Sequence, residues 1–378
     1  MSSHARRLLL LSGLAAHLGH GVQRIATDAT VGRWRSLPRK ISDLNPAYLS
    51  GLTGRRIESV SVLGGDAGTS SRARLALTGE APESVFVKMP ATTAATRMMG
   101  ELGRLGHTEV RFYRQLAAAT PGAPRAYGAA FDGLTGRYVL VLEDLTLSTC
   151  EFPDTLHPLD SDRAAQTVEL LARVHAAWWT QLPEHSGTGP LGWLYSASGD
   201  DTSLLTGSLL KLATKRLAES TDIPVDRGRF IDENYRAAAQ LLDRPPHTLM
   251  HGDAHPGNLY FRDGQAGLLD WQAVRRGHPG RELAYTVITS MTTPDRQAAE
   301  RDLLETYRGA LIAAGGPPLD RDELWERYRL GAIYGYAAAV ITAGLGGMQD
   351  EGIAHEGARR GVAALDDLET VALLKKLL

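Results

Sequence analysis

Hydrophobic and polar residues alternate in several short stretches of the N-terminal part of the chain. A period of two is typical of strands whose side chains point in turn to a core and to solvent. The last two stretches flank a polar turn and therefore predict a hairpin. The pattern predicts a five-stranded sheet, with strands at residues 57–63, 73–77, 85–88, 126–131 and 137–142.

Helical spacing of apolar residues replaces this alternation elsewhere. Asn45 followed by Pro46 predicts a helix start, because the amide side chain can cap free N–H groups and proline fits the first turn. One helix is expected over residues 97–116, and apolar residues recur at helical intervals from Ser161 onwards. The sequence therefore predicts an α+β protein with a small antiparallel sheet in one lobe and a mostly helical second lobe. The expected boundaries are 1–44 for an N-terminal extension, 45–144 for the sheet-containing lobe and 145–378 for the helical lobe.

The composition is that of a large folded chain. Of its 378 residues, 43% are hydrophobic and 22% are charged, which is enough to bury a sizeable core. A net charge of −2 gives no basic field that would attract nucleic acid. Cys150 is the single cysteine, so no disulfide can form within the chain, and a reducing, cytoplasmic location is expected.

An apolar segment near the N-terminus includes Leu8 to Leu11 and continues to Leu18. About a dozen residues are too few to span a bilayer, but they suit a core helix, an interfacial helix or the apolar part of a signal peptide. We expect a helix that packs on the body of the protein or on a partner, and no membrane span. A weak contact of residues 5–18 with a membrane or partner stays open.

The stretch His251-Gly-Asp-Ala-His-Pro-Gly-Asn258, followed by Leu268-Leu-Asp270, carries the candidate chemistry. Its spacing matches the H-x-D-x-x-x-x-N loop of kinases. Phosphoryl transfer needs one carboxylate that orients the attacking hydroxyl, and an amide oxygen and a second carboxylate that hold magnesium. Asp253, Asn258 and Asp270 provide these groups in this order.

These motifs resemble the aminoglycoside phosphotransferase and choline kinase superfamily, over roughly residues 50–300. The phrases Leu-Glu-Asp-Leu at 142–145 and Val-His-Ala-Ala-Trp-Trp at 174–179 further resemble its ecdysteroid-kinase-like subgroup. The resemblance implies a two-lobed, protein-kinase-like fold. It also implies ATP- and Mg²⁺-dependent phosphorylation of a hydroxyl group on a small molecule.

The resemblance also implies residue roles. Asp253 is the expected base and His251 is expected to brace its loop, while Asn258 and Asp270 are expected to hold Mg²⁺. Lys88 would bind the phosphates, and Glu109 would orient it, with Glu101 as the competing partner. The remaining nucleotide contacts are expected from backbone groups of a glycine loop at 64–71 and of a hinge. These positions are Gly68, Thr69 and Ser70 in the loop, and Glu143 and Leu145 in the hinge.

Several alternatives remain open. The glycine loop can be a plain hairpin turn, and the whole chain can be a nucleotide-binding protein without catalytic activity. His251, Asp253 and His255 can instead ligate zinc or iron in a metallohydrolase. Glu282 stands where many relatives carry an aspartate and can replace it in anchoring the catalytic loop.

The acceptor is not identified by the sequence. The segment 271–279 is too short to seat a peptide, so a small molecule is expected. A polycationic acceptor needs a carboxylate-rich cleft, for which Asp200, Asp201, Asp350 and Glu351 are candidates unless they form a solvated face. Four aromatic residues instead favour an acceptor with apolar surface: Trp178, Trp179, Trp193 and Tyr195.

Overall fold

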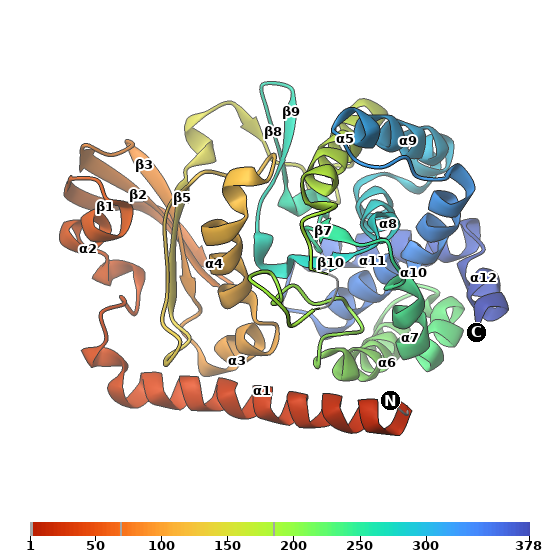
Figure 1. The fold of residues 1–378 in the computed structure, drawn as a ribbon, viewed down its shortest axis with the longest axis horizontal. Helices are drawn as coiled ribbons and strands as arrows, with labels where there is room; N and C mark the ends of the chain where they lie inside the picture. Colours follow the sequence, from red (N-terminus) through yellow and green to blue (C-terminus); the bar gives the residue numbers. More distant parts are fainter. Residues whose placement is uncertain (1–2, 69, 184–185) are drawn as a thin grey trace. The chain divides into compact units, whose positions relative to one another are not determined.

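The computed structural model describes residues 3–68, 70–183 and 186–378. The chain divides into two compact units (Figure 1). The first comprises Met1–Cys150 together with Asp270–Ala273, and the second comprises Glu151–Leu269 and Val274–Leu378. The short segment that carries Asp270 therefore belongs to the first unit, although it lies far along the chain.

The first unit contains a five-stranded antiparallel sheet, as predicted. Its strand order is β1-β2-β3-β5-β4. The first two strands are longer than expected, because they continue into the predicted glycine loop, β1 as far as Ala67 and β2 from Ser70 onwards. The strands are β1 Ile57–Ala67, β2 Ser70–Gly79, β3 Ser84–Pro90, β4 Ala126–Phe131 and β5 Tyr138–Glu143.

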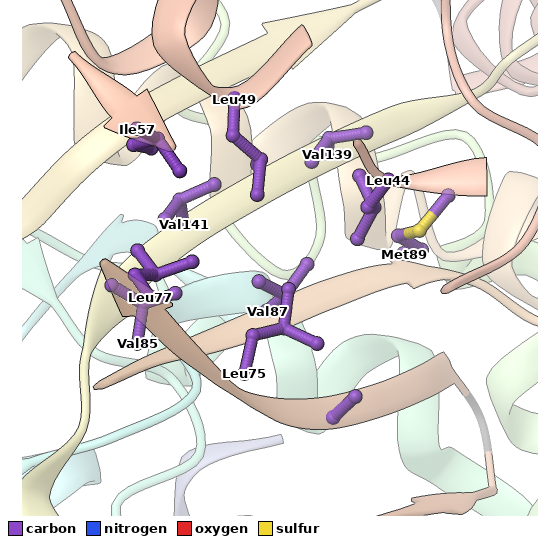
Figure 2. Packing of buried hydrophobic residues seen from close by; sticks show 11 residues of the cluster. Leu44, Leu49, Ile57, Leu75, Leu77, Val85, Val87, Met89, Val139 and Val141 are labelled. Carbon is purple, nitrogen blue, oxygen red and sulfur yellow. The ribbon is translucent and has the colours of Figure 1, made fainter. Parts of the chain in front are cut away.

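One face of this sheet packs against the helix α2, Pro46–Thr53. The alternation in the sequence explains the packing: Ala73 and Leu75 are buried on β2, whereas Arg74 between them is partly exposed. Leu49 of α2 is fully buried among the sheet residues (Figure 2). The helix begins where predicted, since the side chain of Asn45 accepts a hydrogen bond from the amide of Tyr48 at 2.9 Å.

Three further helices complete the first unit: α1 Ser3–Val31, α3 Ala94–Leu102 and α4 Leu105–Gln115. The single helix predicted at 97–116 was wrong, because Gly103 and Arg104 interrupt it and Arg104 adopts a φ of 53°. The helix α1 packs on α3. Its Asp28 is buried and pairs with Arg97 of α3 and with Arg137, which directly precedes β5.

The second unit is mostly helical, as predicted. Its helix α8, Pro279–Ser290, is buried along its whole length and packs against α10 and α11. Its other helices are α5 Ser161–Trp178, α6 Ser203–Ser220, α7 Arg229–Leu242, α9 Thr293–Ala313, α10 Arg321–Leu345, α11 Glu351–Asp367 and α12 Thr370–Leu377. The later strands are β6 Cys150–Glu151, β7 Thr248–Met250, β8 Leu259–Arg262, β9 Gln265–Leu268 and β10 Arg275–Gly277.

Two short antiparallel strand pairs flank the polar loop at residues 251–258 of the second unit. β7 pairs with β10, and β8 pairs with β9 through a turn in which Asp263 and Gly264 both have positive φ. No helix among the described residues is long and apolar enough to cross a membrane.

Candidate active site

The loop between β7 and β8 carries Asp253 and Asn258 and holds them together. The side-chain amide of Asn258 donates to the backbone oxygen of Asp253 at 2.8 Å and to its Oδ2 at 3.3 Å. The other carboxylate oxygen, Oδ1, accepts from the hydroxyl of Tyr285 at 2.9 Å. Each oxygen of Asp253 thus has a fixed donor, which sets the direction of the carboxylate.

His251 is hydrogen-bonded to backbone groups of this loop and of Leu269. It is fully buried, and its Nε2 bonds to the backbone oxygen of Leu269 at 2.7 Å. Its Nδ1 accepts from the amide of Asp253 at 3.2 Å. Both ring nitrogens are therefore hydrogen-bonded to backbone groups, and neither is directed at a metal site. The geometry thus gives no support to a metallohydrolase that uses His251 as a ligand.

Glu282 anchors the same loop from the first turn of α8. Its carboxylate accepts from the amides of His251 at 3.1 Å and Gly252 at 2.6 Å, and it contacts Nε2 of His175 at 2.9 Å. Burial raises the pKa of Glu282, but the bonds from His175 and Gly252 outweigh it and leave that pKa below its ordinary value. The anchoring role suggested for Glu282 by its position in the sequence therefore has a geometric basis.

Tyr285 is a site residue that the sequence reasoning missed. It lies one turn after Glu282 on α8, on the same face of the helix, and this spacing was the available signal. Burial and the neighbouring Asp253 hold the pKa of Tyr285 well above its ordinary value, so the phenol stays protonated and donates to the carboxylate. Tyr334 of α10 supports the loop in a similar way, since its hydroxyl donates to the backbone oxygen of Gly252 at 2.6 Å.

Lys88 is the centre of the polar cluster in the first unit. It lies on β3 and is 4% exposed. Its Nζ is 2.8 Å from Oε2 of Glu109 on α4 and 2.7 Å from Oδ1 of Asp270. The expected contact with Glu109 is present, whereas the competing candidate Glu101 pairs with Arg24 of α1 at 2.8 Å.

The charges of this cluster are unequal, since one ammonium group faces two carboxylates. Burial lowers the pKa of Lys88, but Asp270 and Glu109 outweigh it, so that pKa lies above its ordinary value. Burial, assisted by repulsion from Asp270, raises the pKa of Glu109 to about 7 against the opposing attraction of Lys88. Near neutral pH the cluster can therefore take up a proton on Glu109.

Asp270 follows β9 and has an unusual backbone. Its φ is 56°, in the left-handed region that is strained for most residues and that Asp tolerates better than most. The preceding residue, Leu269, donates its amide to the backbone oxygen of Asn258 at 2.8 Å. Asp270 thus directly follows a residue that is hydrogen-bonded to the loop carrying Asp253 and Asn258.

The donor set of Asn258 and Asp270 fits magnesium. The amide nitrogen of Asn258 donates to Asp253, so its oxygen Oδ1 is the atom of this side chain that would face a cation. Carboxylate and amide oxygens are the ligands that hard cations such as Mg²⁺ prefer. Within the described residues, no group of three or more His, Cys, Asp and Glu side chains is placed to hold a metal ion.

Of the three residues expected to contact phosphates in the glycine loop, the structure describes Gly68 and Ser70. Thr69 lies outside the described residues. The amide of Gly68 donates to the backbone oxygen of Ser70 at 3.0 Å, and Ser70 begins β2 as a buried residue. Below the turn, Arg72 and Asp66 form an ion pair at 2.7 Å across the two strands. The turn is therefore closed by protein contacts of its own.

The predicted hinge follows β5. The backbone amide of Glu143, the last residue of β5, donates to the oxygen of Arg125 at 2.8 Å. Asp144 caps the short turn Leu145–Leu147 by accepting from the amide of Thr146 at 3.1 Å. Leu145 itself is buried. The side chains here stabilise the turn, and a contact with a base would come from backbone groups.

Comparison with known proteins identifies one family. A model of the phosphotransferase enzyme family matches residues 64–330. No curated protein matches the chain.

Several solved structures are similar in fold. A protein provisionally described as a fructosamine-3-kinase, from Thermobifida fusca YX-ER1, is 18% identical with a TM-score of 0.50, covering 89% of this chain and 99% of that one. The choline kinase LicA of Streptococcus pneumoniae is 16% identical with a TM-score of 0.47, covering 83% and 94%. The choline kinase of Cryptosporidium parvum Iowa II is 11% identical with a TM-score of 0.48, covering 89% and 92%. The first of these similarities shows a shared fold and no more.

Proposed function

The chain belongs to the phosphotransferase enzyme family, and we propose that it transfers the γ-phosphoryl group of Mg²⁺-bound ATP to a hydroxyl group of a small molecule. The observation that carries this proposal is the fixed orientation of the Asp253 carboxylate. Its carboxylate is oriented by Tyr285 and Asn258, on a loop that Glu282 and His251 hold from behind. A fixed, partly exposed carboxylate is what general-base catalysis on a hydroxyl group requires.

In the proposed reaction, Asp253 accepts the proton of the acceptor hydroxyl as the oxygen attacks the γ-phosphorus. The bond between that phosphorus and the bridging oxygen breaks, and ADP leaves with the electron pair. Magnesium, when bound, neutralises charge on the phosphates. Oδ1 of Asn258 and the carboxylate of Asp270 are its proposed ligands in this chain.

Lys88 and Glu109 are the residues that we propose for binding the phosphates of the nucleotide. The ammonium group of Lys88 is buried with Glu109 at 2.8 Å and is thereby directed, so that it can bind α- and β-phosphate oxygens. We assign the same nucleotide to Lys88 and Asp253, because Asp270 contacts Lys88 and its neighbour Leu269 is bonded to the catalytic loop. Backbone groups of the turn at 68–70 and of the hinge at Glu143 and Leu145 are the proposed contacts for phosphates and base.

The acceptor is a small molecule in this proposal. After Asp270 the chain forms one short turn and the strand β10, which pairs with β7 and leads directly into α8. This stretch is part of the folded body, so it is not a platform on which a peptide substrate could lie. The contacts that orient Asp253 favour catalysis over nucleotide binding alone, because binding of a nucleotide does not require an oriented carboxylate in this loop.

The proposal is tested by replacing Asp253 with Asn. Loss of the base should lower kcat by about 10²–10⁴-fold and leave the nucleotide Kd within a few-fold of its original value. ADP release in the presence of a panel of hydroxylated acceptors measures kcat, and calorimetry with an ATP analogue measures Kd. Asp263→Asn is the matched control, since Asp263 is exposed in the β8–β9 turn and Asn tolerates its positive φ.

The alternatives give different results. Unchanged turnover in Asp253→Asn would remove Asp253 from the mechanism. Tight nucleotide binding by the original protein, without ADP release for any acceptor, would instead favour the non-catalytic alternative.

A further inference from the structure

A small cavity in the second unit adjoins the side chains that surround Asp253. Tyr285 and His255 both line it. The hydroxyl of Tyr285 donates to Oδ1 of Asp253 at 2.9 Å, and Nε2 of His255 lies 3.9 Å from Oδ2. A group bound in this cavity would therefore lie beside the two residues that flank the proposed base.

The lining of the cavity is almost free of charge. It contains hydroxyl and amide groups next to small apolar side chains, and among the described residues that line it there is no carboxylate, lysine or arginine. His255 is the only basic side chain, and its Nδ1 accepts from the amide of Gly257 at 3.1 Å. The walls come mainly from α8, α10 and α11, with Thr289, Ala339, Thr342, Ile353 and Gly357 and, between the helices, Gln349.

A buried arginine shapes the walls without entering the cavity. Arg360 is 5% exposed, and it donates to the backbone oxygens of Thr289 at 2.9 Å and Thr155 at 2.7 Å. Its Nε donates to Glu356 at 3.0 Å. Both threonines line the cavity, so Arg360 ties two of its walls together while its own charge is matched by Glu356.

Asp350 and Glu351, which follow the lining residue Gln349 in the sequence, do not point their carboxylates into the cavity lining. Asp350 caps α11 by accepting from the amides of Gly352 at 2.9 Å and Ile353 at 3.4 Å. The side chain of Glu351 is 86% exposed. Of the carboxylates considered for a polycationic acceptor, Asp350 thus caps a helix and Glu351 is exposed to solvent.

We infer that this cavity receives the hydroxyl-bearing part of an uncharged acceptor, such as a sugar, a polyol or another alcohol. The inference rests on the proposed function and narrows its substrate class. The lining itself offers a quaternary ammonium or polyamine no carboxylate in exchange for its lost hydration, which is costly. A hydroxylated carbon skeleton instead meets Thr342 and Gln349 with its polar groups and Ile353 with its C–H groups.

Binding of uncharged and cationic probes to the full chain tests this inference. Saturation-transfer NMR would compare myo-inositol, glucose and glycerol with choline and spermidine, in the presence of Mg²⁺ and a non-hydrolysable ATP analogue. We expect at least one uncharged probe to bind and the two cations to bind more weakly.

Gly357→Val is the variant that fills the cavity. A Cβ at Gly357 meets only Ala339 Cβ, at 3.9 Å, so the helix accepts the side chain while the added methyl groups occupy the space. Binding of the uncharged probe should weaken by about tenfold or more. Gly309→Val is the matched control: Gly309 lies on an exposed face of α9, where an added Cβ meets nothing within 4 Å.

The outcomes separate this inference from the proposed function. Preferred binding of choline or spermidine, no binding of any uncharged probe, or undiminished binding in folded Gly357→Val would each overturn the assignment of the cavity. Thermal unfolding and nucleotide binding establish that the variant is folded. ADP release is scored separately: a protein that binds the uncharged probes but never releases ADP refutes the phosphotransfer and leaves the cavity assignment in place.

Discussion

Single hydrogen bonds decide how the carboxylate of Asp253 is presented. Tyr285 and Asn258 each bind one of its oxygens, and Glu282 holds the loop through two backbone amides. None of these partners is next to Asp253 in the sequence. The base is therefore positioned by side chains whose contribution depends on geometry at the level of tenths of an ångström.

Replacing Tyr285 with Phe tests this positioning. A hydrogen bond to a charged group contributes about 1.5–3 kcal/mol, so its loss should lower kcat by about 10–100-fold. Nucleotide binding should change little, because the phenol contacts the base and not the phosphate cluster. Stopped-time assays of ADP release measure the effect. Tyr127→Phe, on β4 of the first unit, is the control, and equal activity of both variants would show that the bond to Asp253 is dispensable.

The raised pKa of Glu109 predicts a pH dependence of stability. The folded carboxyl has a pKa of about 7 against an ordinary value of 4.5, so the folded state binds more protons than the unfolded state between these values. The contribution of this group to stability is therefore greatest below pH 4.5 and declines as the pH rises towards 7. In Glu109→Gln, which mimics the protonated form, this decline should be absent.

Thermal unfolding of the nucleotide-free protein between pH 5 and pH 8, about the range of that change, measures it. The difference between the two proteins should move in favour of Glu109→Gln as the pH rises. Parallel curves for the two proteins would show that Glu109 stays ionised throughout. Glu80→Gln, at an exposed position in the turn after β2, controls for the loss of one acidic residue.

At the scale of elements, α1 is fastened to the first unit by buried charges. Asp28 on its last turns pairs with Arg97 and Arg137, which are themselves buried. Burial raises the pKa of Asp28, but Arg137 and Arg97 outweigh it and hold that pKa below its ordinary value. The helix also contributes Arg24, which pairs with Glu101 on α3. The N-terminal segment is thus joined to the helix that precedes α4 and its Glu109.

We predict that Asp28→Asn destabilises the protein by about 3 kcal/mol, because two buried guanidinium groups lose their carboxylate. Chemical denaturation measured by fluorescence gives the change in the free energy of unfolding. Asp302→Asn, on an exposed face of α9, should change it by less than about 0.5 kcal/mol. A similarly small effect of Asp28→Asn would mean that solvent compensates the two arginines.

At the scale of the whole molecule, the candidate groups are distributed over two compact units. Asp253 and Asn258 belong to the second unit, whereas Lys88, Glu109 and Asp270 belong to the first. The peptide bond between Leu269 and Asp270 passes from one unit to the other. If the proposed function is correct, binding of a nucleotide should stabilise the folded protein.

The metal dependence of that stabilisation is a separate prediction. ATP with Mg²⁺ at 100 times its Kd should stabilise the protein by about 2.7 kcal/mol, visible as a higher unfolding temperature. Asp270→Ala, or chelation of the metal, should remove most of the increase, because Asp270 is a proposed ligand. Asp302→Ala, on an exposed face of α9, is the control. A full increase without divalent metal would exclude Asn258 and Asp270 as a required metal site.

The sequence by itself determined where the five strands of the sheet lie. Alternating apolar residues are sufficient to predict the five strands, because burial of one sheet face imposes a period of two. The helix break at Gly103 and Arg104 was not predicted, since nothing in the apolar periodicity marks it. The spacing of His251, Asp253 and Asn258 likewise indicated a single polar loop, and the structure places these three residues in the loop between β7 and β8.

The tertiary structure decided which distant residues complete the site. Glu109 and Glu101 were both acceptable partners for Lys88 from the sequence, and only the packing of α1 on α3 assigns Glu101 to Arg24. Tyr285 was missed for the same reason, since its value depends on the direction in which α8 crosses the loop. Short-range patterns fix what a segment becomes, whereas the contacts between segments depend on the fold of the entire unit.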